Sequence, residues 1–376
     1  MITVERVDTT SKKDVERFVG IPFKLYAECP QWVPPLRADI RTMLNRDKHP
    51  FYEHSDADFF IARRDGEEVG RIGALENRRF NAYHDSHQAQ FYLFECIHDH
   101  EVARALFNRV FEWARARGLN EVVGPKGFSP FDGYGIQVEG FEHRQMMMMM
   151  NYNYAFYPDL VEGLGFEKEV DFISTYIKLA DFEVPERIHR VAERVKKRRN
   201  LTVHSFGSKL ELRRWKGRIG AAYNRTFVDN WEYYPLTENE IDFTFSDLVL
   251  AANPKLIKVV LREGNIVGFI LGFPDVSRGL QRANGSLLPL GLLHILLDMR
   301  RTKWISLNGV GIVPEFQGLG GNALLYSEMA KTVKGDLGFV HAELTQVAES
   351  AVQMRRDLIN LGAKPYKNHR VYIRKI

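Results

Sequence analysis

Cysteine is nearly absent from the sequence. Only Cys29 and Cys96 occur among 376 residues, and two thiols cannot build the disulfide framework of a small secreted scaffold. Neither cysteine has neighbours at the spacing of a metal site, so we expect no metal. Such sparse cysteine fits a reducing compartment, and we expect the protein to act in the cytoplasm.

Long hydrophobic runs are missing as well. The longest apolar stretch, residues 287–299, is too short to span a bilayer. Residues 1–18 lack the apolar core of a signal peptide. We therefore expect no membrane partner and no secretion.

The chain also lacks an excess of one charge. Lys and Arg total 52 against 48 Asp and Glu, a formal net charge of +4, which favours no nucleic-acid partner. The sequence is 45% hydrophobic and 12% aromatic, as is typical of a globular protein with a large core. At this length we expect two domains.

The order of the expected elements occurs twice along the chain. Each half reads as a strand, helices, a hairpin, a strand, a helix, a strand, a helix and a strand, with hairpin turns at Asp65-Gly66 and Gly264-Asn265. This repetition predicts a tandem duplication of one α/β unit. The predicted division is an N-terminal domain at 1–183, a basic linker helix at 184–200 and a C-terminal domain at 201–376.

A glycine-rich turn precedes a predicted helix in the second half. Residues 310–325 read VGIVPEFQGLGGNALL. A helix N-terminus carries unpaired N–H groups and the positive end of the helix dipole, and glycines let a phosphate approach that backbone. A tight strand-to-helix connection is the alternative explanation. Dinucleotide and P-loop motifs are excluded, because G-x-G-x-x-G is absent and no G-K-[ST] follows.

The segment PEFQGLG, from Pro314 to Gly320, resembles the [QR]-x-x-G-x-[GA] signature of the GCN5-related N-acetyltransferases (GNATs). In that family the loop holds the pyrophosphate of coenzyme A, and the preceding strand, here 310–313, offers backbone groups to the pantetheine arm. Residues 32–40, 49–54 and 124–140 further resemble a group of bacterial tandem acetyltransferase-like proteins.

The resemblance implies an α/β (α+β) fold of two tandem GNAT-like domains, each a mixed central sheet flanked by helices. It implies acetyl-CoA or another acyl-CoA as the cofactor, bound by the second domain. The cofactor-binding residues that it implies are Ile312, Val313, Gln317, Gly318, Leu319, Gly320, Gly321 and Asn322.

Three positions depart from the family pattern. Asn322 stands where the family has Gly or Ala, and Ala351 and Leu358 stand where it often has an Asn and a Tyr, so the usual general acid is missing. In the first half, the matching strand-to-helix junction has no glycine, and acidic residues between 95 and 101 would repel phosphate. We expect the first domain not to bind coenzyme A.

Acyl transfer from a thioester to an amine needs a base, a donor for the oxyanion and a proton for the thiolate. Alternation along 339–347 puts His341 and Glu343 on one face of a strand, and either is a candidate base, with ordinary structural hydrogen bonds as the alternative. Asn308 on the cofactor strand could orient a water. The resemblance implies the backbone N–H of Ile312 as the oxyanion donor. The tyrosines available for the thiolate are Tyr326, Tyr366 and Tyr372.

Five consecutive methionines occupy positions 146–150. Their flexible thioethers could line a deformable apolar pocket for an acyl chain or an aromatic substrate. A buried strand explains them as well. The run alone does not distinguish these two hypotheses.

The residues and the resemblance together predict an acyl-CoA-dependent N-acyltransferase, an acetyltransferase in the simplest case, acting on a small-molecule amine. One alternative is a non-catalytic acyl-CoA-binding protein of the same fold, which Ala351 and Leu358 favour. Another is an aminoacyl transferase of the Fem type. Binding of tRNA would need a strong basic channel, which the small net charge disfavours.

Overall fold

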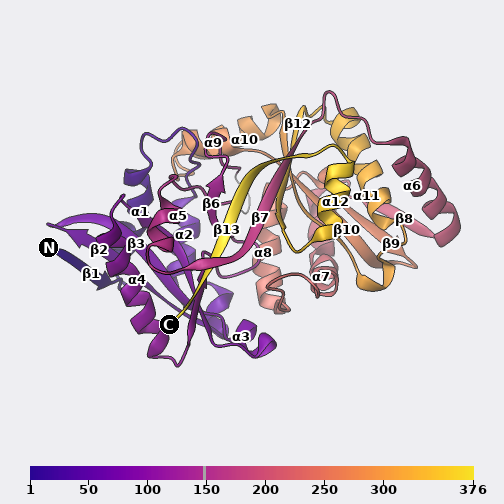
Figure 1. Ribbon diagram of the computed structural model, residues 1–376. Helices are drawn as coiled ribbons and strands as arrows, with labels where there is room; N and C mark the ends of the chain where they lie inside the picture. Colours follow the sequence, from indigo (N-terminus) through magenta and orange to yellow (C-terminus); the bar gives the residue numbers. More distant parts are fainter. Residues whose placement is uncertain (147–149) are drawn as a thin grey trace. The chain divides into compact units, whose positions relative to one another are not determined.

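The computed structural model describes residues 1–146 and 150–376 (Figure 1). They form two compact units, which interleave along the chain. Unit 1 contains Met1–Ile173, Val276–Asp298 and Lys367–Ile376, and unit 2 contains Ser174–Asp275 and Met299–Tyr366. The linear domain limits at 183 and 201 therefore stay a prediction. Of the methionine run, 147–149 lie outside the described residues, and Met146 and Met150 are buried.

Unit 1 is built on a mixed sheet with the strand order β1-β2-β3-β4-β5-β13, and β6 also pairs with β13. Strands β4 and β5 are parallel, and the other pairs of this sheet are antiparallel. The strands are β1 (Ile2–Arg6), β2 (Asp56–Arg64), β3 (Glu67–Glu76), β4 (Gln88–Cys96), β5 (Glu121–Gly124), β6 (Ile136–Glu139), β7 (Glu167–Lys178) and β13 (Lys364–Lys375). The helices are α1 (Lys12–Leu25), α2 (Arg37–Leu44), α3 (Arg78–His84), α4 (His100–Arg115), α5 (Tyr157–Glu162) and α9 (Ser277–Ala283).

The two faces of this sheet carry separate cores because side chains alternate along β2. Phe59 and Ile61 pack with α1, whereas Phe60 and Ala62 pack with α4. The hairpin between β2 and β3 turns at Asp65-Gly66, both with positive φ, which confirms the predicted turn.

Unit 2 holds the second sheet, with the order β7-β12-β11-β10-β9-β8, to which β7 contributes from Ser174 onward. The strands are β8 (Leu201–Ser205), β9 (Ile257–Arg262), β10 (Asn265–Pro274), β11 (Trp304–Ile312) and β12 (His341–Ala348). The helices are α6 (Glu186–Arg199), α7 (Lys209–Thr226), α8 (Glu238–Ala251), α11 (Gly321–Ala330) and α12 (Val352–Asn360), while α10 (Gly291–Arg301) runs from unit 1 into unit 2.

The sheet of unit 2 also has different helices packed on its two faces. Ile305 and Ala342 belong to a core with Leu324 and Leu325 of α11, whereas α7 and α8 pack over the apolar side chains of β10 on the other face. Among the described residues, no helix combines the length and the apolar character needed to cross a membrane.

The second hairpin differs from its prediction by one residue. Positive φ occurs at Glu263 and Gly264, and Asn265 already pairs with Arg262. The turn is therefore Glu263-Gly264 and not Gly264-Asn265. Glu263 and Gly264 are the two central residues of a two-residue hairpin loop, in which both adopt positive φ, and Asn265 is the first residue of β10.

The predicted linker helix is helical, but its apolar face is packed. Helix α6 lies against α11, with Val195 buried. Polar side chains of α6 also bond to α11. The His189 ring forms a hydrogen bond with the Ser327 hydroxyl at 2.9 Å, and the Lys196 ammonium donates to the Glu328 carboxylate at 2.8 Å. Helix α6 is thus a fixed part of unit 2, because a stripe of apolar side chains on a helix is stabilised by burial.

Candidate functional site

Strand β11 carries a bulge in its middle. The register with β10 shifts between Ile270, which faces Val310, and Gly272, which faces Leu307. Gly309 has φ +93°, a conformation that glycine adopts without strain. The bulge bends the second half of β11 away from its earlier course.

Past the bulge, β11 and β12 are no longer paired. Their parallel pairing runs from Trp304 with His341 to Leu307 with Leu344, and in the described part of the chain residues 308–312 of β11 have no β12 partner. The two strands therefore open into a gap at the carboxyl end of β11.

Backbone groups of Ile312 face this gap. The N–H of Val313 donates to the carbonyl of Val267 at 3.0 Å, so those two residues form a hydrogen-bonded pair of the antiparallel ladder. Ile312, opposite Gly268, then falls in a non-hydrogen-bonded pair, and its N–H and C=O point away from β10. The side-chain amide of Gln317 donates to the Ile312 carbonyl at 3.3 Å.

The glycine turn ends at the start of α11. Gly318 and Gly320 have positive φ, and Gly320 is the N-cap of the helix. Among the described residues, the N–H groups of Gly318 and of 320–323 have no backbone acceptor, and the first backbone bond of the helix is from Leu324 to Gly320. A helix start of this kind can bind an anion.

The three glycines have different neighbours. A Cβ at Gly318 would meet no atom within 4 Å, one at Gly320 would lie 2.6 Å from Val195 of α6, and one at Gly321 would lie 2.8 Å from Ile312. Ligand approach is thus one explanation for Gly318, whereas close packing explains the other two. Asn322 lies inside α11 and adopts no positive φ.

A polar row crosses the sheet face opposite α11. Glu343 pairs with Ser306, and the Ser306 hydroxyl bonds to that of Thr345 at 2.9 Å. Directly paired residues share a face, so Glu343 and His341 lie together on the side toward α7 and α8, as the alternation predicts. Glu343 is fully buried.

His341 stands at the closed end of this row. Its Nδ1 lies 2.7 Å from the Tyr176 hydroxyl, and its ring stacks on Trp304 with centroids 4.4 Å apart. Burial, and secondarily the charge of Lys178, lower the pKa of His341. Tyr176 and Trp304 were not predicted, because nothing in the local sequence ties them to His341.

Asn308 sits at the bulge, two residues beyond Ser306. It is buried, and among the described residues its Nδ2 has no hydrogen-bond partner. A buried amide donor without an acceptor is costly. A ligand carbonyl in the gap would satisfy it.

The three candidate tyrosines are separated. Tyr372 donates to Glu162 at 2.9 Å within unit 1, and Tyr366 packs near Tyr176. Tyr326 lies on α11, and its hydroxyl contacts the sulfur of Met354 on α12 at 3.3 Å. Burial raises the pKa of Tyr326, so its hydroxyl keeps its proton at neutral pH.

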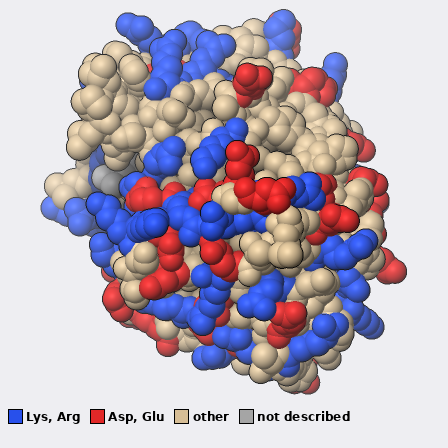
Figure 2. All heavy atoms as spheres, turned by 90° about the vertical axis from the view of Figure 1, so that its left-hand side faces the viewer, with Lys and Arg blue, Asp and Glu red and all other residues tan. Residues whose placement is uncertain are grey.

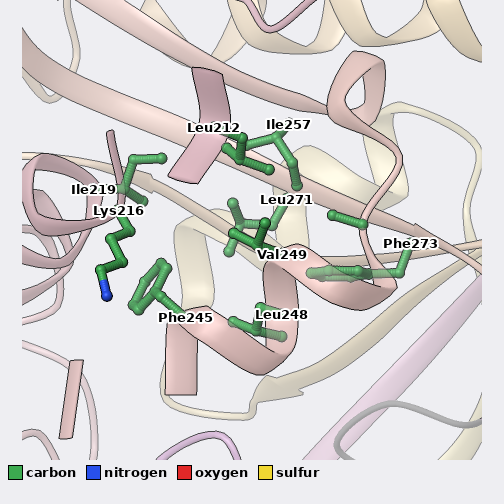
Figure 3. A pocket seen from close by; sticks show the side chains of 10 residues that line it. Leu212, Lys216, Ile219, Phe245, Leu248, Val249, Ile257, Leu271 and Phe273 are labelled. Carbon is green, nitrogen blue, oxygen red and sulfur yellow. The ribbon is translucent and has the colours of Figure 1, made fainter. Parts of the chain in front are cut away.

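An apolar cavity of about 20 Å³ lies beneath α7 and α8, against β9 and β10. Figure 3 shows Leu212 of α7 beside Ile257 of β9, with Ile219 and Lys216 of α7 on the side of the cavity where Phe245 of α8 lies. The Lys216 ammonium pairs with Asp242 at 3.0 Å. Phe273, which lines the cavity, pairs with Ser306 of the polar row.

The donor set fits a phosphate-bearing, amide-containing ligand. Free N–H groups at the α11 start suit a diphosphate, and the outward groups of Ile312 with the Asn308 amide suit an extended amide chain. In residues 1–146 and 150–376, no group of three or more His, Cys, Asp or Glu side chains is placed to hold a metal ion.

Unit 1 repeats the bulge but closes the gap. Leu93 of β4 has positive φ at a register shift with β3, and three residues later Cys96 occupies the position that Ile312 has after Gly309. The N–H of Cys96 donates to the Tyr157 hydroxyl at 3.0 Å, and that hydroxyl donates to the Glu95 carboxylate at 2.9 Å. A side chain therefore fills the place where an extended ligand would bind.

Tyr157→Phe tests this closure. We expect the variant to lose about 1 to 3 kcal/mol of unfolding free energy in urea, because the buried Cys96 N–H and Glu95 each lose a partner. Tyr83→Phe, at a half-exposed ring, is the control and keeps its stability. If Tyr157→Phe has the same free energy of unfolding as the wild type, the Tyr157 hydroxyl does not close the gap.

No family model matches the chain. It is 25% identical over 374 residues to Protein YghO of Escherichia coli K12, with 97% of this chain and 94% of that protein covered. It is 28% identical over 371 residues to the bacterial ceramide synthase of Caulobacter vibrioides, with 96% and 94% covered.

Solved structures resemble the whole chain. A tandem GNAT protein from the clavulanic acid biosynthesis pathway superposes with a TM-score of 0.59 at 11% identity, covering 100% of this chain and 98% of that one. A probable N-acyltransferase from Enterococcus faecalis gives a TM-score of 0.54 at 10% identity, covering 100% and 72%. The chain has the tandem GNAT fold: a mixed α/β architecture in which the GNAT-like arrangement occurs twice.

Proposed function

We propose that the chain is an acyl-CoA-dependent N-acyltransferase that binds its cofactor in unit 2 and acylates a small-molecule amine in the cytoplasm. The observation that carries this proposal is the gap between β11 and β12, into which Ile312 directs its backbone groups, beside the free N–H groups at the start of α11. Acetyl-CoA or another acyl-CoA would supply an activated thioester at this site.

The residues around the gap match the needs of this reaction. The amine nitrogen attacks the thioester carbonyl, a C–N bond forms, and the C–S bond breaks to release the thiolate. Glu343 would take the ammonium proton, the N–H of Ile312 would face the oxygen that gains charge, and Tyr326 could return a proton to the thiolate. Tyr326 would thereby replace the general acid that is missing at Leu358.

The acceptor that we propose to test first is a long-chain amino alcohol. One relative is named a ceramide synthase, and a ceramide is the amide of a fatty acid with such an amine. The apolar cavity beneath α7 and α8 adjoins the polar row and supports an apolar substrate group there. At about 20 Å³ it holds no chain as it stands, so α7 and α8 would have to move apart.

Calorimetric titration with acetyl-CoA and longer acyl-CoAs tests the proposal. We expect micromolar affinity for at least one acyl-CoA and slower hydrogen exchange at 310–323. A panel of amines with thiol release as the readout then tests transfer. If every acyl-CoA in the panel gives only its heat of dilution, acyl-CoA binding is refuted.

Two alternatives have distinct outcomes. Bound acyl-CoA that no amine turns over would support a non-catalytic binding protein, which Ala351 and Leu358 favour. An aminoacyl transferase would bind tRNA with steep salt dependence. Over much of the face in Figure 2, Lys and Arg are interspersed with Asp and Glu, which disfavours a basic channel there.

A further inference from the structure

Leucine side chains are exposed on the segment that joins α9 to α10 and on α10 itself. We call this set the leucine patch. Its members, with the exposed fraction of each, are Leu287 (38%), Leu288 (79%), Leu290 (56%), Leu292 (49%), Leu293 (51%) and Leu296 (47%). So many exposed leucines within ten residues are uncommon on a soluble protein, and exposed apolar surface of this kind marks an interaction site.

The rest of unit 1 holds the base of this segment in place. The side-chain amide of Gln281 on α9 donates to the carbonyls of Pro30 (2.8 Å) and Trp32 (2.9 Å). The N–H of Arg37 donates to the carbonyl of Gly285 at 2.9 Å. These bonds anchor the start of the segment that carries the leucines.

The joining loop is itself closed by hydrogen bonds. The Ser286 hydroxyl donates to the carbonyl of Leu288 at 2.8 Å, and the N–H of Leu292 donates to the carbonyl of Leu287, also at 2.8 Å. A Cβ at Gly279 would lie 2.8 Å from the Ile295 backbone, so α9 packs tightly on α10. The leucine patch is therefore presented on a preformed support.

The exposed charged side chains of α9 and α10 are basic. Arg278 and Arg282 on α9 are exposed, and α10 ends in the exposed pair Arg300 and Arg301. The acidic residue of segment 277–301 is Asp298, whose carboxylate accepts the N–H of Gly279 at 2.7 Å.

We propose that the leucine patch docks on the surface of a membrane that contains anionic lipids. Apolar side chains beside arginines are the composition of interfacial membrane-binding segments, in which leucines enter the headgroup boundary and arginines attract anionic lipid. A two-fold contact between copies of the chain would bring the arginines of both copies together, and this repulsion disfavours it.

This proposal is independent of the acyl-transfer site and goes beyond it. The sequence-based expectation of no membrane partner rested on the lack of a stretch long enough to span a bilayer. Surface docking requires no such stretch. We therefore propose membrane association in place of that expectation.

Vesicle flotation with the full chain tests the docking. We expect the protein to float with vesicles of equal parts phosphatidylcholine and phosphatidylglycerol, and about tenfold less with phosphatidylcholine alone. Leu288→Glu with Leu292→Glu lowers partitioning about tenfold or more, because both side chains leave the lipid. Leu210→Glu, at a leucine of α7 whose exposed fraction (62%) lies between those of Leu288 and Leu292, is the control and floats as the wild type does.

Two further results decide the proposal. Arg278→Glu with Arg282→Glu should also lower partitioning, and all variants should keep the wild-type melting temperature. A wild-type protein that stays at the bottom of the gradient with anionic vesicles overturns the proposal. The proposal is also overturned if the wild type does not bind vesicles, sediments as a dimer, and becomes a monomer in the variant Leu288→Glu with Leu292→Glu. That result would assign the leucine patch to contact with a second copy of the chain.

Discussion

Glu343→Gln will lower the rate of acyl transfer about 10²- to 10⁴-fold, while the affinity for coenzyme A stays within about twofold of the wild type. The amide has the shape of the carboxylate but cannot accept the ammonium proton. Because Glu343 is fully buried, the isosteric variant keeps the packing of β12. Steady-state kinetics with the best amine of the panel, together with calorimetry, measure both quantities.

Position along the strands favours Glu343 over His341 as the base. The paired part of β11 and β12 ends at Leu307 and Leu344, so Glu343 is next to the point where the gap begins. His341 lies two residues, or about 7 Å, deeper in the paired region, where Tyr176 engages its Nδ1.

His341→Gln is the matched control on the same face. We expect less than about a tenfold loss of rate for it, because it remains outside the gap. Equal losses in the two variants would contradict the assignment of Glu343, and a larger loss for His341→Gln would make the histidine the base. A weakened affinity for coenzyme A in Glu343→Gln would instead indicate damage to the fold.

Local features of the fold are predictable from the sequence because short-range chemistry determines them. Helix α8 begins after Thr237 with a capping box, in which the N–H of Glu240 donates to the Thr237 hydroxyl at 3.1 Å and the Glu240 carboxylate accepts the Thr237 N–H at 2.8 Å. The Asp65-Gly66 hairpin and the repeated element order belong to the same class. Each depends on residues that are neighbours in the sequence.

Long-range packing was beyond prediction. The Val195 side chain of α6 covers Gly320, more than a hundred positions away in sequence, and no local pattern indicates that contact. Tyr157 likewise reaches the backbone of Cys96 across 61 positions. The sequence therefore indicated where an anion could bind in unit 2, but not which glycine serves the ligand and which serves the fold.

Gly320→Ala will lower the unfolding free energy by about 2 to 5 kcal/mol. The backbone there has φ +89°, which costs an L-residue about 1 to 2 kcal/mol. The new Cβ would also lie 2.6 Å from Val195 and 3.0 Å from Val191, and overpacking of this kind costs about 1 to 3 kcal/mol. Urea denaturation measures the sum.

Gly318→Ala separates the two contributions because its Cβ would meet no atom within 4 Å. At φ +69° we expect only the backbone cost of about 1 to 2 kcal/mol. If the N–H groups of the turn hold a diphosphate, this same Cβ obstructs it, and the affinity for coenzyme A falls at least about tenfold.

Val195→Ala combined with Gly320→Ala completes the comparison. Removing the two methyl groups of Val195 should relieve most of the overpacking at the new Cβ, so that only the backbone cost of Gly320→Ala remains. A double-mutant cycle isolates the energy of the contact between the two positions. If Gly318→Ala binds coenzyme A as tightly as the wild type, the turn is only a strand-to-helix connection. The glycines would then be required only for close packing between β11, α6 and α11. The assignment of the anion site would be wrong, although the fold would be unaffected.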